Sequence, residues 1–168
     1  NRDYGNKLIL NFLESDKIVT SIVAPGGFGK SVLIAKVIEN FWQNSNCLFP
    51  NDILWFIDAG SLNGLVAKGF NISAWIADQF GFNTGINYRD FFKGNYKRTN
   101  GRVILVIDAL DEITHKESMM VDVFHSLNQL IASNSENPWL KIILTMRNLT
   151  WMRFASIIQT YPETKGLW

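Results

Sequence analysis

A glycine-rich segment, set between an apolar run and an amphipathic stretch, constrains the fold of this chain more than any other part of its sequence. Residues 18–24 (IVTSIVA) form an apolar run of strand length, and residues 31–43 (SVLIAKVIENFWQ) place apolar side chains at helical spacing. Between them, residues 25–29 (PGGFG) have the composition of a loop. A buried strand, a short loop and a helix in this order predict one strand-and-helix unit of an α/β sheet.

The same alternation continues along the chain. Further strands are predicted at residues 53–58, 103–108 and 140–145. Further helices are predicted at residues 72–80, 88–96, 116–133 and 151–160. Strands that alternate with helices are joined by right-handed crossovers, so we expect a three-layer α/β fold with a mostly parallel sheet. With 168 residues and 47% hydrophobic side chains, the chain is sized for one domain.

The polar ends of the predicted strands indicate where a ligand binds. In a parallel sheet of this kind, ligands bind outside the carboxyl ends of the strands. The loops that meet there follow Ala24, Asp58, Asp108 and Thr145. Three of these loops carry residues suited to phosphate or to a metal ion.

The first of the three loops matches a phosphate-binding pattern. Residues 24–31 (APGGFGKS) fit G-x-x-x-x-G-K-[ST] at every fixed position except the first, where Ala24 replaces glycine. Backbone N–H groups in such a loop wrap a phosphate chain at the positive end of a helix dipole, and glycines allow the close approach. The residues expected to hold the nucleotide are Pro25, Gly26, Gly27, Phe28, Gly29, Lys30, Ser31 and Val32.

Two side chains of this loop have specific expected roles. Lys30 would place its ammonium on the β- and γ-phosphates of ATP, and Ser31 would place its hydroxyl on Mg²⁺. The alternative is a glycine-rich turn before an amphipathic helix, which the strand and helix on either side disfavour.

The second loop carries three carboxylates at the end of an apolar run. Asp108 follows residues 103–107 (VILVI) directly and is placed to hold Mg²⁺ through its water shell. Asp111 and Glu112 are alternative candidates for orienting and deprotonating the attacking water. The alternative interpretation is an acidic surface loop after a core strand.

The third loop carries a cation. Arg147 follows residues 142–146 (IILTM) and could sense a γ-phosphate, because arginine is always charged and suits phosphate oxygens. On its own, this position is more often a solvent-exposed or structurally paired arginine.

Composition excludes several classes of partner. Sixteen basic and fifteen acidic side chains leave a net charge of +1, which gives no bulk attraction to nucleic acid or to an anionic membrane. The basic cluster of Lys93, Lys97, Arg98 and Arg102 is interpreted as a solvated face. Apolar runs are too short to span a bilayer, and the first residues lack a signal-peptide pattern. Together with Cys47 as the only cysteine, this favours the cytoplasm.

The three loops together resemble the NACHT family within the STAND class of P-loop NTPases. Its Walker B strand has four apolar residues, Asp, a small residue, an apolar residue and Asp-Glu, which is similar to residues 104–112. Its sensor 1 motif, an apolar strand closing in Thr-Ser-Arg, is similar to residues 144–147, with Met146 where serine is usual. Arg2 and Asp3 resemble the Arg-Glu start that borders the base pocket in many STAND proteins.

This resemblance implies a sheet of order 5-1-4-3-2, with the fifth strand beyond the end of this chain. It also implies a larger protein with a helical lid and with effector and sensor regions in the same chain. Such a protein is a nucleotide switch: ADP and the lid hold a closed monomer, ATP permits homo-oligomerisation, and slow hydrolysis resets it. ATP or ADP with Mg²⁺ would be the ligand, and defence or cell-death signalling the setting.

Three alternatives have different consequences. An AAA+-like motor acting on nucleic acid or protein would turn over continuously and use an arginine finger from a neighbouring subunit. A scaffold would bind nucleotide without hydrolysing it. A small-molecule kinase is disfavoured, because the Asp111-Glu112 pair points to water as the acceptor.

Overall fold

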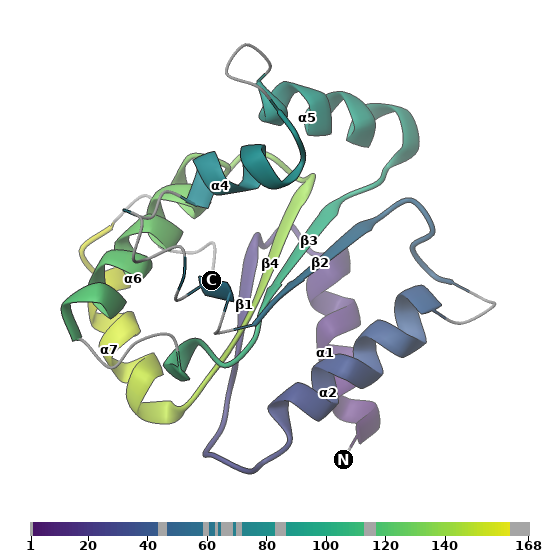
Figure 1. Ribbon diagram of the computed structural model, residues 1–168. Coiled ribbons are helices and arrows are strands. Elements are labelled where there is room, and N and C mark those ends of the chain that lie inside the picture. Colours follow the sequence, from purple (N-terminus) through teal and green to yellow (C-terminus); the bar gives the residue numbers. More distant parts are fainter. Residues whose placement is uncertain are drawn as a thin grey trace.

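A parallel four-stranded sheet forms the centre of the computed structural model (Figure 1). The structure describes residues 2–43, 47–58, 61–62, 64, 69, 72–82, 87–112 and 117–161. The strands are β1 (Val19–Val23), β2 (Ile53–Ile57), β3 (Val103–Ile107) and β4 (Leu140–Met146). Their order in the sheet is β1-β4-β3-β2. The prediction of a parallel α/β sheet, and of the 1-4-3-2 part of the strand order, is confirmed.

Helices cover both faces of this sheet. On one face lie α1 (Arg2–Glu14) and α2 (Lys30–Ile38), and on the other lie α4 (Ile72–Gln79), α6 (Glu117–Ala132) and α7 (Asn148–Ile158) (Figure 1). Helix α5 (Tyr88–Thr99) lies toward the amino ends of the strands. Two short turns complete the described elements: η1 (Glu39–Gln43), a π-helical continuation of α2, and η2 (Leu110–Glu112), a 3-10 turn after β3.

Strand alternation divides the apolar side chains between two cores. Leu105 and Ile107 on β3 face the core formed with α4, α5, α6 and α7. Ile104 and Val106 face the smaller core formed with α1 and α2. Because β3 is covered on both faces, all five of its residues are buried, which explains its unbroken apolar sequence.

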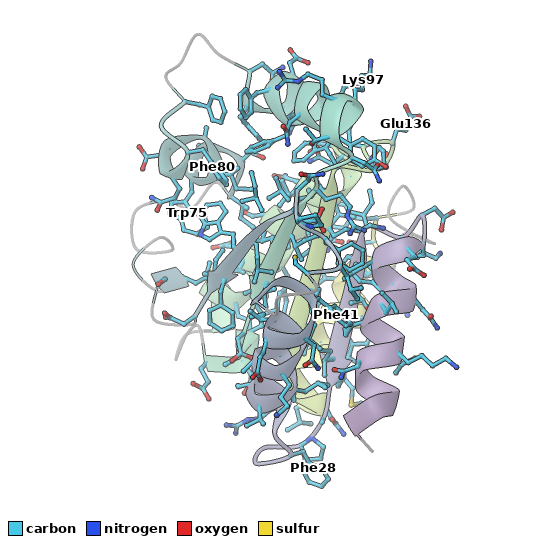
Figure 2. All side chains as sticks on the ribbon, turned by 90° about the vertical axis from the view of Figure 1, so that its right-hand side faces the viewer. Phe28, Phe41, Trp75, Phe80, Lys97 and Glu136 are labelled. Carbon is cyan, nitrogen blue, oxygen red and sulfur yellow. The ribbon has the colours of Figure 1, made fainter. Side chains whose placement is uncertain are left out.

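The strand register brings the functional loops to one edge of the sheet. Val23 pairs with Met146, and Ile107 pairs with Leu144. Ile57 pairs with Ile107 on the other side of β3. The loops after all four strands therefore begin at the same end of the sheet, as predicted. Figure 2 shows Phe28, in the loop after β1, at the end of the molecule away from Lys97 and Glu136.

Several helices differ from the sequence prediction, among them α5, which ends at Thr99 instead of at residue 96. Helix α1 was not predicted, although its buried residues Ile9, Phe12 and Leu13 have helical spacing. The α-helical part of α2 ends at Ile38, where the π-helical turn takes over. Helix α7 begins at Asn148, because the Trp151 N–H donates to the carbonyl of Arg147.

The amino ends of the strands hold two cations, Lys141 and Arg102, that are mostly shielded from solvent and contact the end of α1. The Lys141 ammonium, on β4, donates to the carbonyl oxygens of Ser15 at 2.6 Å and Lys17 at 2.5 Å. Burial lowers the pKa of Lys141 to about 8, and the positive charge of Arg102 adds to this effect. Arg102 donates to the carbonyl of Leu13.

Arg102 does not belong to the exposed basic cluster with which the sequence grouped it. Its guanidinium pairs with Asp52 at 2.7 Å, and the two side chains are 11% and 2% exposed. Lys93, Lys97 and Arg98 remain exposed on α5. Within the described residues, no helix combines the length and the apolar character that crossing a membrane requires.

Candidate nucleotide-binding site

The loop between β1 and α2 has the backbone conformation of a phosphate cradle. Gly27 and Gly29 adopt φ values of 77° and 76°, in the left-handed region that favours glycine. A Cβ atom on Gly27 would meet nothing within 4 Å, so conformation rather than space calls for glycine there. Gly29 caps α2, and its carbonyl accepts the first helical hydrogen bond, from Leu33. The N–H groups of the first turn of α2 are left to face the loop, as anion binding requires.

Lys30, the first residue of α2, reaches back across this loop. Its ammonium donates to the carbonyl oxygens of Ala24 at 2.9 Å and Pro25 at 3.1 Å. An ammonium has three N–H donors, and these two bonds hold the charge beside the cradle. The helix and the loop thus place a cation where a phosphate chain would lie.

A buried hydroxyl joins the ends of β3 and β4. Thr145 donates to Asp108 Oδ1 at 2.5 Å and accepts from the Ala109 N–H at 2.9 Å. Thr145 is fully buried, and Asp108 is 8% exposed. Ala109 adopts a left-handed conformation with φ 57°, which turns the chain sharply into η2. Sequence reasoning assigned no role to Thr145, although it is a polar residue at the end of a buried strand and matches the threonine of the sensor 1 pattern.

Arg147 pairs with the acidic turn after β3. Its Nε lies 2.7 Å from Asp111 Oδ2, and its backbone N–H donates to Asp111 Oδ1 at 3.0 Å. Its Nη2 lies 3.8 Å from Glu112 Oε1. The guanidinium also lies against the phosphate-binding loop, because a Cβ on Gly26 would be 3.6 Å from its Cζ.

These groups line one cleft of about 280 Å³ at the carboxyl ends of β1, β3 and β4. Its lining residues are Gly26, Gly27, Gly29, Lys30, Ser31, Val32, Ala109, Asp111, Glu112, Thr145 and Arg147. Nine of the predicted site residues therefore come together. Asp108 lies behind this surface, bonded to Thr145, while Pro25 and Phe28 are exposed outside it.

The donor set suits Mg²⁺ bound together with a nucleotide. Among the residues that the structure describes, no three His, Cys, Asp or Glu side chains cluster closely enough to hold a metal ion by themselves. Mg²⁺ commonly keeps several waters and uses one or two protein oxygens with substrate phosphates. The Ser31 hydroxyl and the Asp108 carboxylate are such oxygens, so they fit this mode of binding.

A second, more apolar groove of about 950 Å³ adjoins the cleft. It lies between α1 and α2, and it shares Gly27, Gly29 and Val32 with the cleft. Phe28 and Val32 are 75% and 57% exposed. The side chains of Arg2 and Asp3, which the resemblance placed beside the base, lie outside the described part of the structure. The base of a nucleotide could lie in this groove while the phosphates of the same nucleotide occupy the cleft.

A protein solved with bound nucleotide shares the parallel α/β fold of this chain. Among solved structures, the chain is similar to the ORC2 protein of Aeropyrum pernix in complexes with ADPNP and ADP, with 15% identity and a TM-score of 0.57. That match covers 99% of this chain and 44% of the ORC2 chain, so this chain spans less than half the length of the ORC2 protein. PCH-2 of C. elegans matches over 86% of this chain and 35% of its own, with 13% identity and a TM-score of 0.44. No family model matches the chain, and no curated protein matches its sequence.

Proposed function

We propose that this chain binds ATP with Mg²⁺, hydrolyses it slowly, and acts as the nucleotide switch of a NACHT-type signalling protein. One observation carries the proposal: the phosphate-binding loop, the acidic turn after β3 and Arg147 line the same cleft. These groups come from three separate strand ends. An acidic loop or a lone arginine with only a structural role would not need to meet a phosphate-binding loop.

Each group has a role in this proposal. The N–H groups of the loop and the Lys30 ammonium bind the β- and γ-phosphates, and Ser31 and Asp108 hold Mg²⁺. When bound, Mg²⁺ would supply positive charge that offsets the charge of the phosphates. Glu112 or Asp111 orients the attacking water, and Arg147 offsets charge on the γ-phosphate. The apolar groove between α1 and α2 would hold the base. Adenine is proposed over guanine from the family resemblance, and no guanine-reading Asn-Lys-x-Asp motif in the sequence contradicts it.

Calorimetric titration with ATP, ADP and GTP in the presence of Mg²⁺ tests the binding step. Wild type should prefer adenine nucleotides, and Lys30→Ala should bind at least about tenfold more weakly, because a charge-assisted contact is lost. Lys97→Ala is the matched control: it removes an exposed lysine from α5, at the opposite end of the molecule, and should bind like wild type (Figure 2). Equal binding by wild type and Lys30→Ala would refute the proposed site.

A motor ATPase of the AAA+ type is the second candidate, and the likeness to the ORC2 fold favours it. Steady-state hydrolysis separates the two. A switch domain should turn over slowly, whereas a motor should turn over continuously and faster on its protein or nucleic-acid substrate. The sequence offers no strong arginine-finger candidate after the acidic turn apart from the short segment 115–118, of which residues 115 and 116 lie outside the described residues.

Glu112→Gln tests the third possibility, a scaffold that binds nucleotide without hydrolysing it. A switch should be trapped with bound ATP by this substitution, because the carboxylate that activates water is lost while the phosphate-binding loop is intact. A scaffold should behave as wild type. Measuring the nucleotide that copurifies with each protein distinguishes these results.

A further inference from the structure

We infer that Asp111 is a positioning residue that holds Arg147 in the cleft, and that Glu112 alone activates the attacking water. This inference rests on the proposed ATPase function and deepens it. The sequence offers both carboxylates for the same role, and their surroundings separate them.

Asp111 is fully engaged with the arginine. Both of its carboxylate oxygens contact Arg147: Oδ1 accepts a hydrogen bond from the backbone N–H at 3.0 Å, and Oδ2 forms an ion pair with Nε at 2.7 Å. Its side chain is only 8% exposed. A general base needs an oxygen within hydrogen-bond reach of the attacking water. Asp111 has little surface on which that water could lie.

Glu112 has the opposite surroundings. Its side chain is 60% exposed and lines the cleft. The Arg147 Nη2 atom lies 3.8 Å from Glu112 Oε1, which is longer than a hydrogen bond. The Glu112 backbone is fixed by its N–H, which donates to the Ala109 carbonyl at 2.8 Å. The residue therefore combines a held backbone with a carboxylate that reaches the solvent of the cleft.

The contact with Asp111 limits the conformations open to the Arg147 side chain. Its side chain is 56% exposed, and a long exposed arginine has many rotamers, whose loss on binding costs free energy. By pairing with Nε, Asp111 holds the guanidinium beside Gly26. By accepting from the backbone N–H, it also holds the start of α7 against the turn after β3. Asp111 thus links the ends of two adjacent strands, β3 and β4 (Figure 1).

A double-mutant cycle of Asp111→Ala and Arg147→Ala tests the inference. Affinities for Mg²⁺-ATP and Mg²⁺-ADP and the single-turnover hydrolysis rate are measured for wild type, both single variants and the double variant. Arg147→Ala should lower the ATP over ADP preference and the rate by about 10- to 100-fold, the usual effect of losing a charged hydrogen bond. Asp111→Ala should cause a similar or smaller loss, and in the Arg147→Ala background it should change both by less than about twofold.

Glu112→Gln separates the two carboxylates. It should lower hydrolysis by at least about 100-fold, as expected for a lost general base, and leave the ATP over ADP preference close to wild type. Asp111→Asn, which retains the acceptor for the Arg147 N–H, should lose less than Asp111→Ala. A purely structural role for Asp111 would lower thermal stability without changing the ATP over ADP preference.

Several results would overturn the inference. Additive losses in the cycle would show that Asp111 does not act through Arg147. Hydrolysis by Glu112→Gln, together with its loss in Asp111→Ala, would make Asp111 the base. Failure of the folded wild-type protein to bind any nucleotide would instead refute the proposed function itself, and the inference with it. Circular dichroism of each variant establishes that it is folded.

Discussion

Thr145→Val removes one hydroxyl group from the point where the ends of β3 and β4 are joined. Valine has nearly the shape of threonine, so packing in the core is almost unchanged. The change leaves two groups without their partner: the Asp108 Oδ1 atom and the Ala109 N–H. The first belongs to the carboxylate proposed to hold Mg²⁺, and the second belongs to the backbone turn that follows it.

The expected loss of stability follows from these two bonds. A hydrogen bond to a charged group contributes about 1.5–3 kcal/mol, and a buried N–H left unpaired costs about 1–3 kcal/mol. Ala109 is partly exposed, so a water molecule from the cleft can accept from its N–H and reduce this free-energy cost. We therefore expect the free energy of unfolding to fall by about 2–4 kcal/mol, out of a total of about 5–15 kcal/mol.

Urea denaturation of wild type, Thr145→Val and Thr145→Ser measures this loss. Thr145→Ser keeps the hydroxyl and loses one methyl group, so it should cost only about 1 kcal/mol. A Thr145→Val protein within about 0.5 kcal/mol of wild type would contradict the reasoning, because this is the limit expected for changes away from such features. So would a Thr145→Ser protein as unstable as Thr145→Val, since packing would then explain both.

Two further predictions concern the part of the fold away from the cleft. The lowered pKa of Lys141, about 8 against the ordinary 10.5, means that unfolding takes up a proton between these values, so the free energy of unfolding should rise with pH across this window. From about pH 7.5 to about pH 9.5 the gain should be about 1–2 kcal/mol in urea denaturation, and Lys141→Met should lack this part of the pH dependence. Gly101→Ala should destabilise by about 3 kcal/mol or more, because its Cβ would lie 2.2 Å from the backbone oxygen of Asn51.

Each of these predictions has a matched control. Other lysines and tyrosines also titrate at high pH, so the difference in slope between wild type and Lys141→Met is the informative quantity. An equal slope in both proteins would show that the Lys141 ammonium is not destabilised by burial. For Gly101, the control is Gly94→Ala in α5, where a Cβ meets nothing within 4 Å. That change should stabilise by about 0.5–1 kcal/mol, and a loss as large as that of Gly101→Ala would refute the argument from space.

Local sequence was sufficient for the strands and for the glycine-rich loop between β1 and α2. Residues 24–31 are contiguous, so their pattern carries both the conformation of the loop and the expected position of Lys30. The apolar run at residues 103–107 predicts a covered strand because both of its faces must be buried. The buried residues of helix α1 have helical spacing, but the polar residues among them made this spacing hard to see in the sequence.

Pairings between distant residues could not be predicted in the same way. Arg147 and Asp111 are 36 positions apart, and only the parallel register of β3 and β4 brings them together. Sequence alone leaves both acidic residues of the turn as candidate bases, because exposure and hydrogen bonding depend on what surrounds each side chain. The grouping of Arg102 with the surface lysines was wrong for the same reason: its partner Asp52 is 50 positions away.

The sequence by itself determined the class of fold and the position of the glycine-rich loop after β1. Both depend on periodicity, glycine conformation and contiguous motifs, which act over a few residues. The tertiary structure decided which strand ends meet, that Thr145 anchors Asp108, and that Lys141 is buried at the end of α1. These features depend on burial and on hydrogen bonds between residues far apart in the chain, and those exist only once the sheet has formed.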